Sequence, residues 1–341
     1  MYKILKIFWK SLNKKFKLYF LISIFFSILS SISEMLTIGS FLPLVTLVLS
    51  PETSDNSILN FLLSINNKLS LGFEDNLIYY FSIIFLFFVA FSTITRVIVL
   101  WWNANFVKKL SVEFSSLILS DLLGNNYLKL LGKDQNKIFS IFLNKIDRFI
   151  DFIQHYISII SNIIISIAII ISLFLVDHII TFLILIFFGI FYSILIYFIK
   201  SKTNKVSKII SYNLDKRVNS IKDSLIYLRQ ILLSSSQNFF INNFRNFESN
   251  IRETTKKMYI YYSFPKIFLE AIAIFVIIFI AFFLLKILNL DRTYIISILA
   301  VVAYASQKLL VYFNQIYHSL TVLNSLRDVS LDVIDEINQK K

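Results

Sequence analysis

Four ionisable side chains lie inside stretches of sequence that are otherwise apolar: Glu34, Arg96, Glu270 and Lys308. Inside a hydrocarbon layer an unpaired charge costs at least about 2.5–3.5 kcal/mol, so each of these residues needs an oppositely charged partner or access to water. Two acids and two bases can neutralise one another. We therefore expect Glu34 to pair with Arg96, and Glu270 to pair with Lys308.

The two cations also have a chemistry of their own. A guanidinium offers paired hydrogen bonds to phosphate oxygens, and an ammonium adds a compact positive charge. Arg96 and Lys308 could therefore line a wetted cavity and attract an anionic headgroup such as a pyrophosphate. This interpretation and the ion-pair interpretation are compatible, because a paired cation can still face a cavity.

Polar residues recur at helical spacing around three of these apolar stretches. At 100° per residue, the members of each set fall on one face of a helix. One set of this kind alone is better explained by hydrogen bonds between packed membrane helices, whereas several sets in one bundle favour a wetted cavity. The sets are Ser23, Ser27, Ser30, Glu34 and Thr37; Gln154, Ser158, Asn162 and Ser172; and Ser297, Tyr304, Lys308, Gln315 and Ser319.

The composition indicates which solvent surrounds these residues. Of 341 residues, 57% are hydrophobic and 16% are charged, which is too apolar for a water-exposed surface. Six windows are long enough to cross a hydrocarbon core of roughly 30 Å, and in lipid each must be a helix because a helix satisfies its own backbone hydrogen bonds. The predicted spans are 18–50, 77–101, 152–176, 179–199, 266–289 and 293–323.

The distribution of basic residues predicts the orientation of these spans. Lys and Arg number 28 in segments 1–17, 102–151, 200–265 and 324–341, against 3 in the alternate loops 51–76, 177–178 and 286–292. This positive-inside pattern predicts a multi-pass protein of the cell membrane with both termini in the cytoplasm. It also accounts for the net charge of +13 without a nucleic-acid partner.

Two of the basic segments, 102–151 and 200–265, are long enough to predict the shape of the protein outside the membrane. A continuous helix over about 137–176 would be roughly 60 Å long, and one over about 179–225 roughly 70 Å, around twice the thickness of the bilayer core. We therefore expect two helical hairpins that project into the cytosol, each with a short cross-piece at its tip. An amphipathic surface helix or a disordered loop is the alternative.

Several motifs carry a resemblance to one known family. The first span contains Glu34, Gly39 and Pro43 at the spacing Glu-x-x-x-x-Gly-x-x-x-Pro, and the fifth contains Pro265, Lys266 and Glu270, close to the pattern Pro-Arg-x-x-x-Glu. These motifs resemble the transmembrane domain of exporter-type ATP-binding-cassette (ABC) transporters, in particular lipid-linked oligosaccharide flippases. The segment from Lys308 to Val311 takes the place of a segment that commonly reads Arg-Leu-Leu-Pro. The two hairpin tips, LLGNNYLKLLGKDQNKIFSIFLNKIDRF and SLIYLRQILLSSSQNFFINNF, are also similar to the family.

The resemblance implies a fold, roles and partners. The fold is all-α, with six transmembrane helices, long cytosolic extensions and two coupling helices, over a domain of 1–325 followed by a helical tail of 326–341. The implied partners are membrane lipid, a second transmembrane subunit in a homodimer, and a separate ABC ATPase domain that binds ATP and Mg²⁺. The implied coupling-helix residues are Asn125, Tyr127, Arg229 and Gln230, and the helix-bend candidates are Gly39 and Pro43.

The sequence contains no motif for chemistry of its own. No G-x-x-x-x-G-K-[ST] loop is present, so we expect ATP to be hydrolysed outside this chain, and we predict no catalytic residue, bound cofactor or metal site. The predicted function is transport of a lipid-linked glycan or another amphiphile. The alternatives are a peptide or drug exporter subunit, an inactive truncated remnant, and a membrane glycosyltransferase or polymerase, which the short, arginine-poor exterior loops disfavour.

Overall fold

The computed structural model describes residues 14–49, 77–124, 145–286 and 292–338, and these segments are almost entirely helical. Five helices contain stretches long and apolar enough to cross a membrane: Lys14–Leu49, Ile78–Ser120, Ile146–Val176, Gln237–Phe282 and Ile295–Ser325. The described part of the chain is therefore an all-α, multi-pass membrane protein, as the composition predicted.

Each predicted span lies almost entirely within one helix, and several helices extend well beyond the span that they contain. They are α2 (Lys14–Leu49), α4 (Leu77–Gly124), α7 (Ile146–Val176), α8 (His178–Ile226), α9 (Leu228–Leu233), α10 (Gln237–Lys286), α11 (Arg292–Ser325) and α12 (Arg327–Asn338). The fourth predicted span, 179–199, corresponds to the start of α8, where His178–Ile194 is a shorter apolar segment than the five stretches above.

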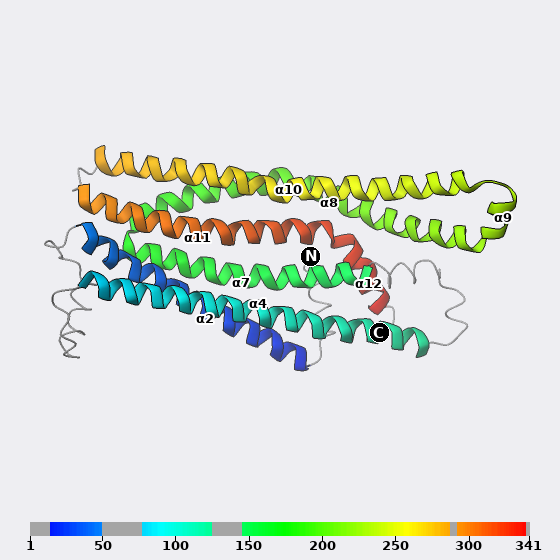
Figure 1. Cartoon of the computed structure of the whole chain (residues 1–341), viewed down its shortest axis with the longest axis horizontal. Coiled ribbons are helices and arrows are strands. Elements are labelled where there is room, and N and C mark those ends of the chain that lie inside the picture. The colour runs from blue at the N-terminus through cyan, green and yellow to red at the C-terminus, as the bar shows by residue number, and fades with distance from the viewer. Residues whose placement is uncertain (1–13, 50–76, 125–144, 287–291, 339–341) are drawn as a thin grey trace.

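Helices α8 and α10 form the long hairpin that helix length predicted. They contain 49 and 50 residues, or about 74 Å each at 1.5 Å per residue. In Figure 1 this hairpin reaches farther than the neighbouring helices and has the short α9 at its tip. The predicted partner hairpin is seen only in part: α7 begins at Ile146, and the expected helix over 137–144 lies outside the described residues.

The turn between α7 and α8 is closed by one side chain. Asp177 ends α7 in an extended conformation, and its Oδ1 accepts hydrogen bonds from the backbone N–H groups of Ile179 at 2.8 Å and Ile180 at 3.0 Å. Such an N-cap satisfies donors that would otherwise lack partners at the start of a helix. The helices α7 and α8 can therefore follow one another with a single residue between them.

Apolar cores join the helices into two groups. One core packs α2 and α7 against α11 through residues such as Ile38, Ile169 and Leu309. A second packs α8 and α10 against the other side of α11, through Ile184, Leu269 and Val302 among others. Helix α11 is thus shared by the α2–α4–α7 group and the α8–α10 hairpin (Figure 1).

A third core closes one end of the first group. It includes Phe106 and Leu110 of α4, Phe149 and Phe152 of α7, and Val333 of α12. Because α12 contributes to this core, the helix after the last span packs back against the bundle. The polar site described next lies farther along α4 and α7, beyond this apolar end.

Candidate functional site

A fully buried carboxylate lies at the centre of the polar site. Glu34 of α2 is 0% exposed. Its Oε1 accepts a hydrogen bond from the Tyr312 hydroxyl of α11 at 3.0 Å, and its Oε2 accepts one from the ammonium of Lys308, one turn earlier on α11. The Arg96 guanidinium of α4 lies 3.8 Å from Oε1. Three helices that are far apart in sequence therefore meet at one acid.

The two cations are held in different ways. Lys308 also donates to the Thr37 hydroxyl at 3.2 Å and lies 4.9 Å from the centre of the Tyr304 ring. Its side chain is 18% exposed. Arg96 makes the longer contact with Glu34, lies 5.4 Å from the centre of the Tyr312 ring, and is 43% exposed. One acid faces two cations, so the cluster carries a surplus positive charge, and Arg96 is the cation more open to its surroundings.

The pairing of Glu34 with Arg96 matches the sequence prediction, whereas Lys308 pairs with Glu34 instead of Glu270. The predicted Glu270–Lys308 pair is therefore corrected. The reason is the rotation of α11: Ala305, Leu309 and Tyr312, which are on the same side as Lys308, belong to the core shared with α2. Glu270 is exposed on α10, which packs against another face of α11.

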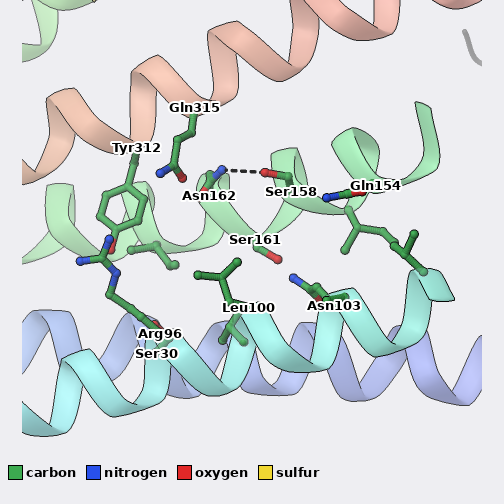
Figure 2. A pocket seen from close by; sticks show the side chains of 15 residues that line it. Ser30, Arg96, Leu100, Asn103, Gln154, Ser158, Ser161, Asn162, Tyr312 and Gln315 are labelled. Carbon is green, nitrogen blue, oxygen red and sulfur yellow. Dashed lines mark hydrogen bonds between the residues drawn. The ribbon is translucent and has the colours of Figure 1, made fainter. Parts of the chain in front are cut away.

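A cavity of about 300 Å³ lies beside this cluster, between α4, α7 and α11. Figure 2 shows Arg96 and Tyr312 close together at one end, with amide and hydroxyl side chains along the remaining length. The apolar part of the wall includes Val107 and Ile157, which also belong to the core at the end of the bundle. The polar lining consists of Ser30, Arg96, Asn103, Gln154, Ser158, Ser161, Asn162, Tyr312 and Gln315.

Hydrogen bonds between helices hold several of these side chains in place. Ser161 of α7 bonds to Ser27 of α2 at 2.9 Å, and Asn103 of α4 accepts from Ser23 at 2.5 Å. Asn162 donates to Ser158 at 3.1 Å (Figure 2). The Ser30 hydroxyl is buried at the cavity wall and has no hydrogen-bond partner among the described protein atoms. A guest molecule with hydroxyl groups could supply one, and buried polar atoms generally have a partner.

The side chains around the cavity are better suited to binding a molecule than to making or breaking covalent bonds. The wall offers hydroxyl and amide groups that both donate and accept, together with one guanidinium that donates to anions. Lys308 and Tyr312 both bond to Glu34, so the buried acid is engaged in holding the helices together. In the described ranges, no group of three His, Asp or Glu side chains gathers in a way that could hold a metal ion.

The other predicted site residues lie elsewhere. Arg229 and Gln230 are exposed on α9, at the tip of the long hairpin, whereas Asn125 and Tyr127 lie outside the described residues. Gly39 and Pro43 are part of α2, which continues through both positions. Because Pro43 has no N–H, it cannot bond to the carbonyl of Gly39, so a bend at this point stays a prediction.

Sequence reasoning missed Tyr312, Asn103 and Ser161. A signal existed for each of them. Tyr312 is four residues after Lys308, and Asn103 is seven residues after Arg96, so each shares a helix face with a residue already singled out. Ser161 is seven residues after Gln154 and therefore lies on the face of that predicted polar set, whereas its hydrogen bond to Ser27 depends on the packing of α2 against α7.

No protein-family model matches this chain, and no curated protein matches it. The features that bear on function are therefore the cavity, the charge cluster at Glu34 and the α8–α10 hairpin, together with the motif resemblance.

Proposed function

We propose that this chain is the transmembrane subunit of an ATP-driven exporter of the ABC class, which moves a lipid-linked glycan across the cell membrane. The observation that carries the proposal is the cavity. Its wall combines a half-exposed arginine with several amide and hydroxyl side chains, although the helices that form it are long and apolar enough to cross a membrane. Polar side chains at this depth are costly and usually mark the path of a substrate.

The lining of the cavity favours one class of cargo. The surplus positive charge near Arg96 attracts an anionic group such as a phosphate or pyrophosphate. The adjoining amides and hydroxyls match the hydrogen bonds that a sugar offers. A cationic drug would meet repulsion from the cluster, and an apolar drug would leave these polar groups without partners. Within the exporter class, the cavity therefore favours an anionic glycolipid over a drug.

The α8–α10 hairpin supports the proposal that a separate ATPase drives transport. Its tip is apolar although it lies at the far end of the hairpin: Leu225, Leu228, Leu233 and Phe239 are all exposed there. A small exposed apolar surface of this kind is typical of a protein contact. We propose that α9 is a coupling helix and that Mg²⁺ and ATP bind to a partner domain.

The remaining parts of the proposal are the topology and the assembly. We propose that the apolar segment His178–Ile194, extended by the rest of α8, forms the remaining span, which is the fourth in chain order. The excess of basic residues in alternate segments supports a cytoplasmic location for both termini. A second copy of the chain completes the transporter, since the cavity opens between helices of a single group and a dimer would enclose it from the other side.

The test is transport by the assembled complex in vesicles. The chain is purified from its own membranes with its bound ATPase, reconstituted, and supplied with Mg·ATP and a fluorescent lipid-linked oligosaccharide. Arg96→Ala should reduce ATP-dependent flipping at least tenfold. Arg252→Ala is the matched control, because this arginine is exposed on α10 and away from the cavity. Absence of an ATPase from the purified complex, or equal flipping by both variants, would overturn the proposal.

A further inference from the structure

One exposed side of α4 is apolar over part of its length and then becomes basic. Phe87, Ile94 and Trp101 are spaced seven residues apart and are all exposed, and Lys108 continues the same series. Seven residues make nearly two turns of a helix, so these side chains form one outward stripe. An apolar stripe that ends in Trp and then Lys is typical of the boundary between the hydrocarbon core and water.

The neighbouring helix α2 shows the same change. Ile32, Phe25 and Leu18 form its exposed apolar stripe at the same spacing, and Lys14, one turn before Leu18, is also exposed. The two helices touch at this level, because Tyr19 of α2 lies 5.7 Å from Trp102 of α4, measured between ring centres. The membrane boundary therefore crosses both helices at the same end.

A lysine and a tyrosine are joined at this boundary. The Lys109 ammonium donates to the Tyr19 hydroxyl at 2.9 Å and lies 4.5 Å from the centre of the Tyr19 ring. The indole N–H of Trp102 donates to the Tyr19 backbone carbonyl at 3.2 Å, which fixes α2 against α4. An ammonium has three N–H donors, so Lys109 retains two for another acceptor.

The junction concentrates positive charge. Lys15 lies one helical turn before Tyr19 on α2, on the same side, so its charge adds to that of Lys109. Lys14, Lys17 and Lys108 lie on the same turns of the two helices. Among the described side chains of segments 14–33 and 97–120, Glu113 is the one acidic residue. Cations gathered at a membrane boundary in this way attract negatively charged lipid headgroups.

We propose that the α2–α4 junction binds the phosphate of an anionic phospholipid between Lys15 and Lys109. Tyr19 holds the Lys109 ammonium in place, and the acyl chains follow the exposed stripes that end at Leu18 and Trp101. The bound phosphate reduces the repulsion between lysines that the packing of α2 against α4 brings together. This site is separate from the cavity, and it requires only that the chain is embedded in a membrane.

The experiment measures lipid-dependent thermal stability of the purified chain in detergent. Phosphatidylglycerol should raise the melting temperature in a saturable manner, whereas zwitterionic phosphatidylcholine should not. Because one lysine near a membrane surface contributes a factor of about five in affinity, the double variant Lys15→Gln/Lys109→Gln should bind phosphatidylglycerol roughly thirtyfold more weakly. Lys15→Arg/Lys109→Arg keeps the charges and should retain most of the affinity, which separates loss of binding from loss of folding.

The matched control is Lys256→Gln/Lys257→Gln, which removes two charges from α10, where both lysines pair with Glu253. This variant should bind phosphatidylglycerol as the wild type does. A third titration uses glycerol 3-phosphate, the headgroup chemistry without acyl chains. Equal stabilisation by glycerol 3-phosphate would overturn the lipid assignment, as would unchanged affinity in the Lys15→Gln/Lys109→Gln variant or an equal loss in the control.

Discussion

The Lys145 ammonium lies 2.6 Å from Oδ2 of Asp332, although the two residues are 187 positions apart in the sequence. The same ammonium lies 2.9 Å from Asp215 of α8, and it is completely buried. Asp332 also accepts a hydrogen bond from Ser211 of α8 at 2.8 Å. One lysine at the start of α7 therefore ties α12 to the part of the α8–α10 hairpin that extends beyond the spans.

Lys145→Ala should lower the free energy of unfolding by about 3 kcal/mol, because it leaves two carboxylates facing each other without their shared cation. Asp332→Asn should cost less, since Lys145 keeps Asp215. Hydrogen exchange should show that the α12 amides lose protection in the lysine variant before those of α7 do. If α12 stays as protected as in the wild type, its attachment depends on Val329, Val333 and Ile334 rather than on the ion pairs.

The two cations at Glu34 should respond differently to removal. Lys308 bonds directly to the buried carboxylate and to Thr37, so Lys308→Ala should destabilise the chain by about 3 kcal/mol. Arg96 is more distant and 43% exposed, so Arg96→Ala should cost under about 1 kcal/mol while still reducing transport. Thermal unfolding of both variants in the same detergent tests this order. Equal losses would show that Arg96 is structural and would weaken its assignment to the cargo.

Pro265 of α10 allows the contribution of one hydrogen bond between α10 and α11 to be measured. Pro265 has no N–H to bond to the carbonyl of Tyr261, four residues earlier, and that carbonyl instead accepts a hydrogen bond from the Tyr317 hydroxyl of α11 at 3.1 Å. Tyr317→Phe should therefore cost about 1 kcal/mol, because it removes the hydrogen bond that the Tyr317 hydroxyl donates to the partly buried Tyr261 carbonyl.

A double-mutant cycle isolates this effect. In a Pro265→Ala background the helix can supply its own N–H to the Tyr261 carbonyl, so Tyr317→Phe should cost clearly less there than in the wild type. Tyr312→Phe, which removes a hydroxyl that bonds to Glu34 instead, should cost the same in both backgrounds. Equal costs of Tyr317→Phe in the two backgrounds would show that the hydroxyl does not replace the missing backbone bond.

Hydropathy and helix length predicted where the helices lie in the sequence better than which of their residues contact one another. The spans and the long hairpin follow from local sequence, because a lipid-embedded segment must be helical and 49 apolar or amphipathic residues without a proline can continue as one helix. The partner of Lys308 could not be predicted in the same way. A sequence fixes which residues share a helix face, but the rotation of α11 relative to α2 and α10 depends on packing among all three helices.

Lys145 illustrates the same limit. In the sequence it is part of the first hairpin-tip segment that resembles the family, and only the return of α12 onto α7 and α8 brings Asp215 and Asp332 to it. The cavity was partly predictable, since three polar stripes were visible in the sequence. The shape of the cavity also depends on uncharged side chains such as Tyr312 and Asn103, which form part of its wall.

Variants of two α9 residues at the tip of the hairpin can distinguish a role in contacting a partner protein from a role in stabilising the fold. Ile231 is the buried residue of α9, whereas Arg229 is exposed, so Arg229→Glu should leave the melting temperature unchanged. If α9 contacts the ATPase, the same charge reversal should reduce transport and the amount of ATPase that purifies with the chain by at least severalfold. Ile231→Ala is the complementary variant: it should loosen α9, seen as faster hydrogen exchange at Leu232 and Leu233, because it removes the side chain that packs under the tip. Full transport and an intact complex in Arg229→Glu would remove this arginine from the coupling site.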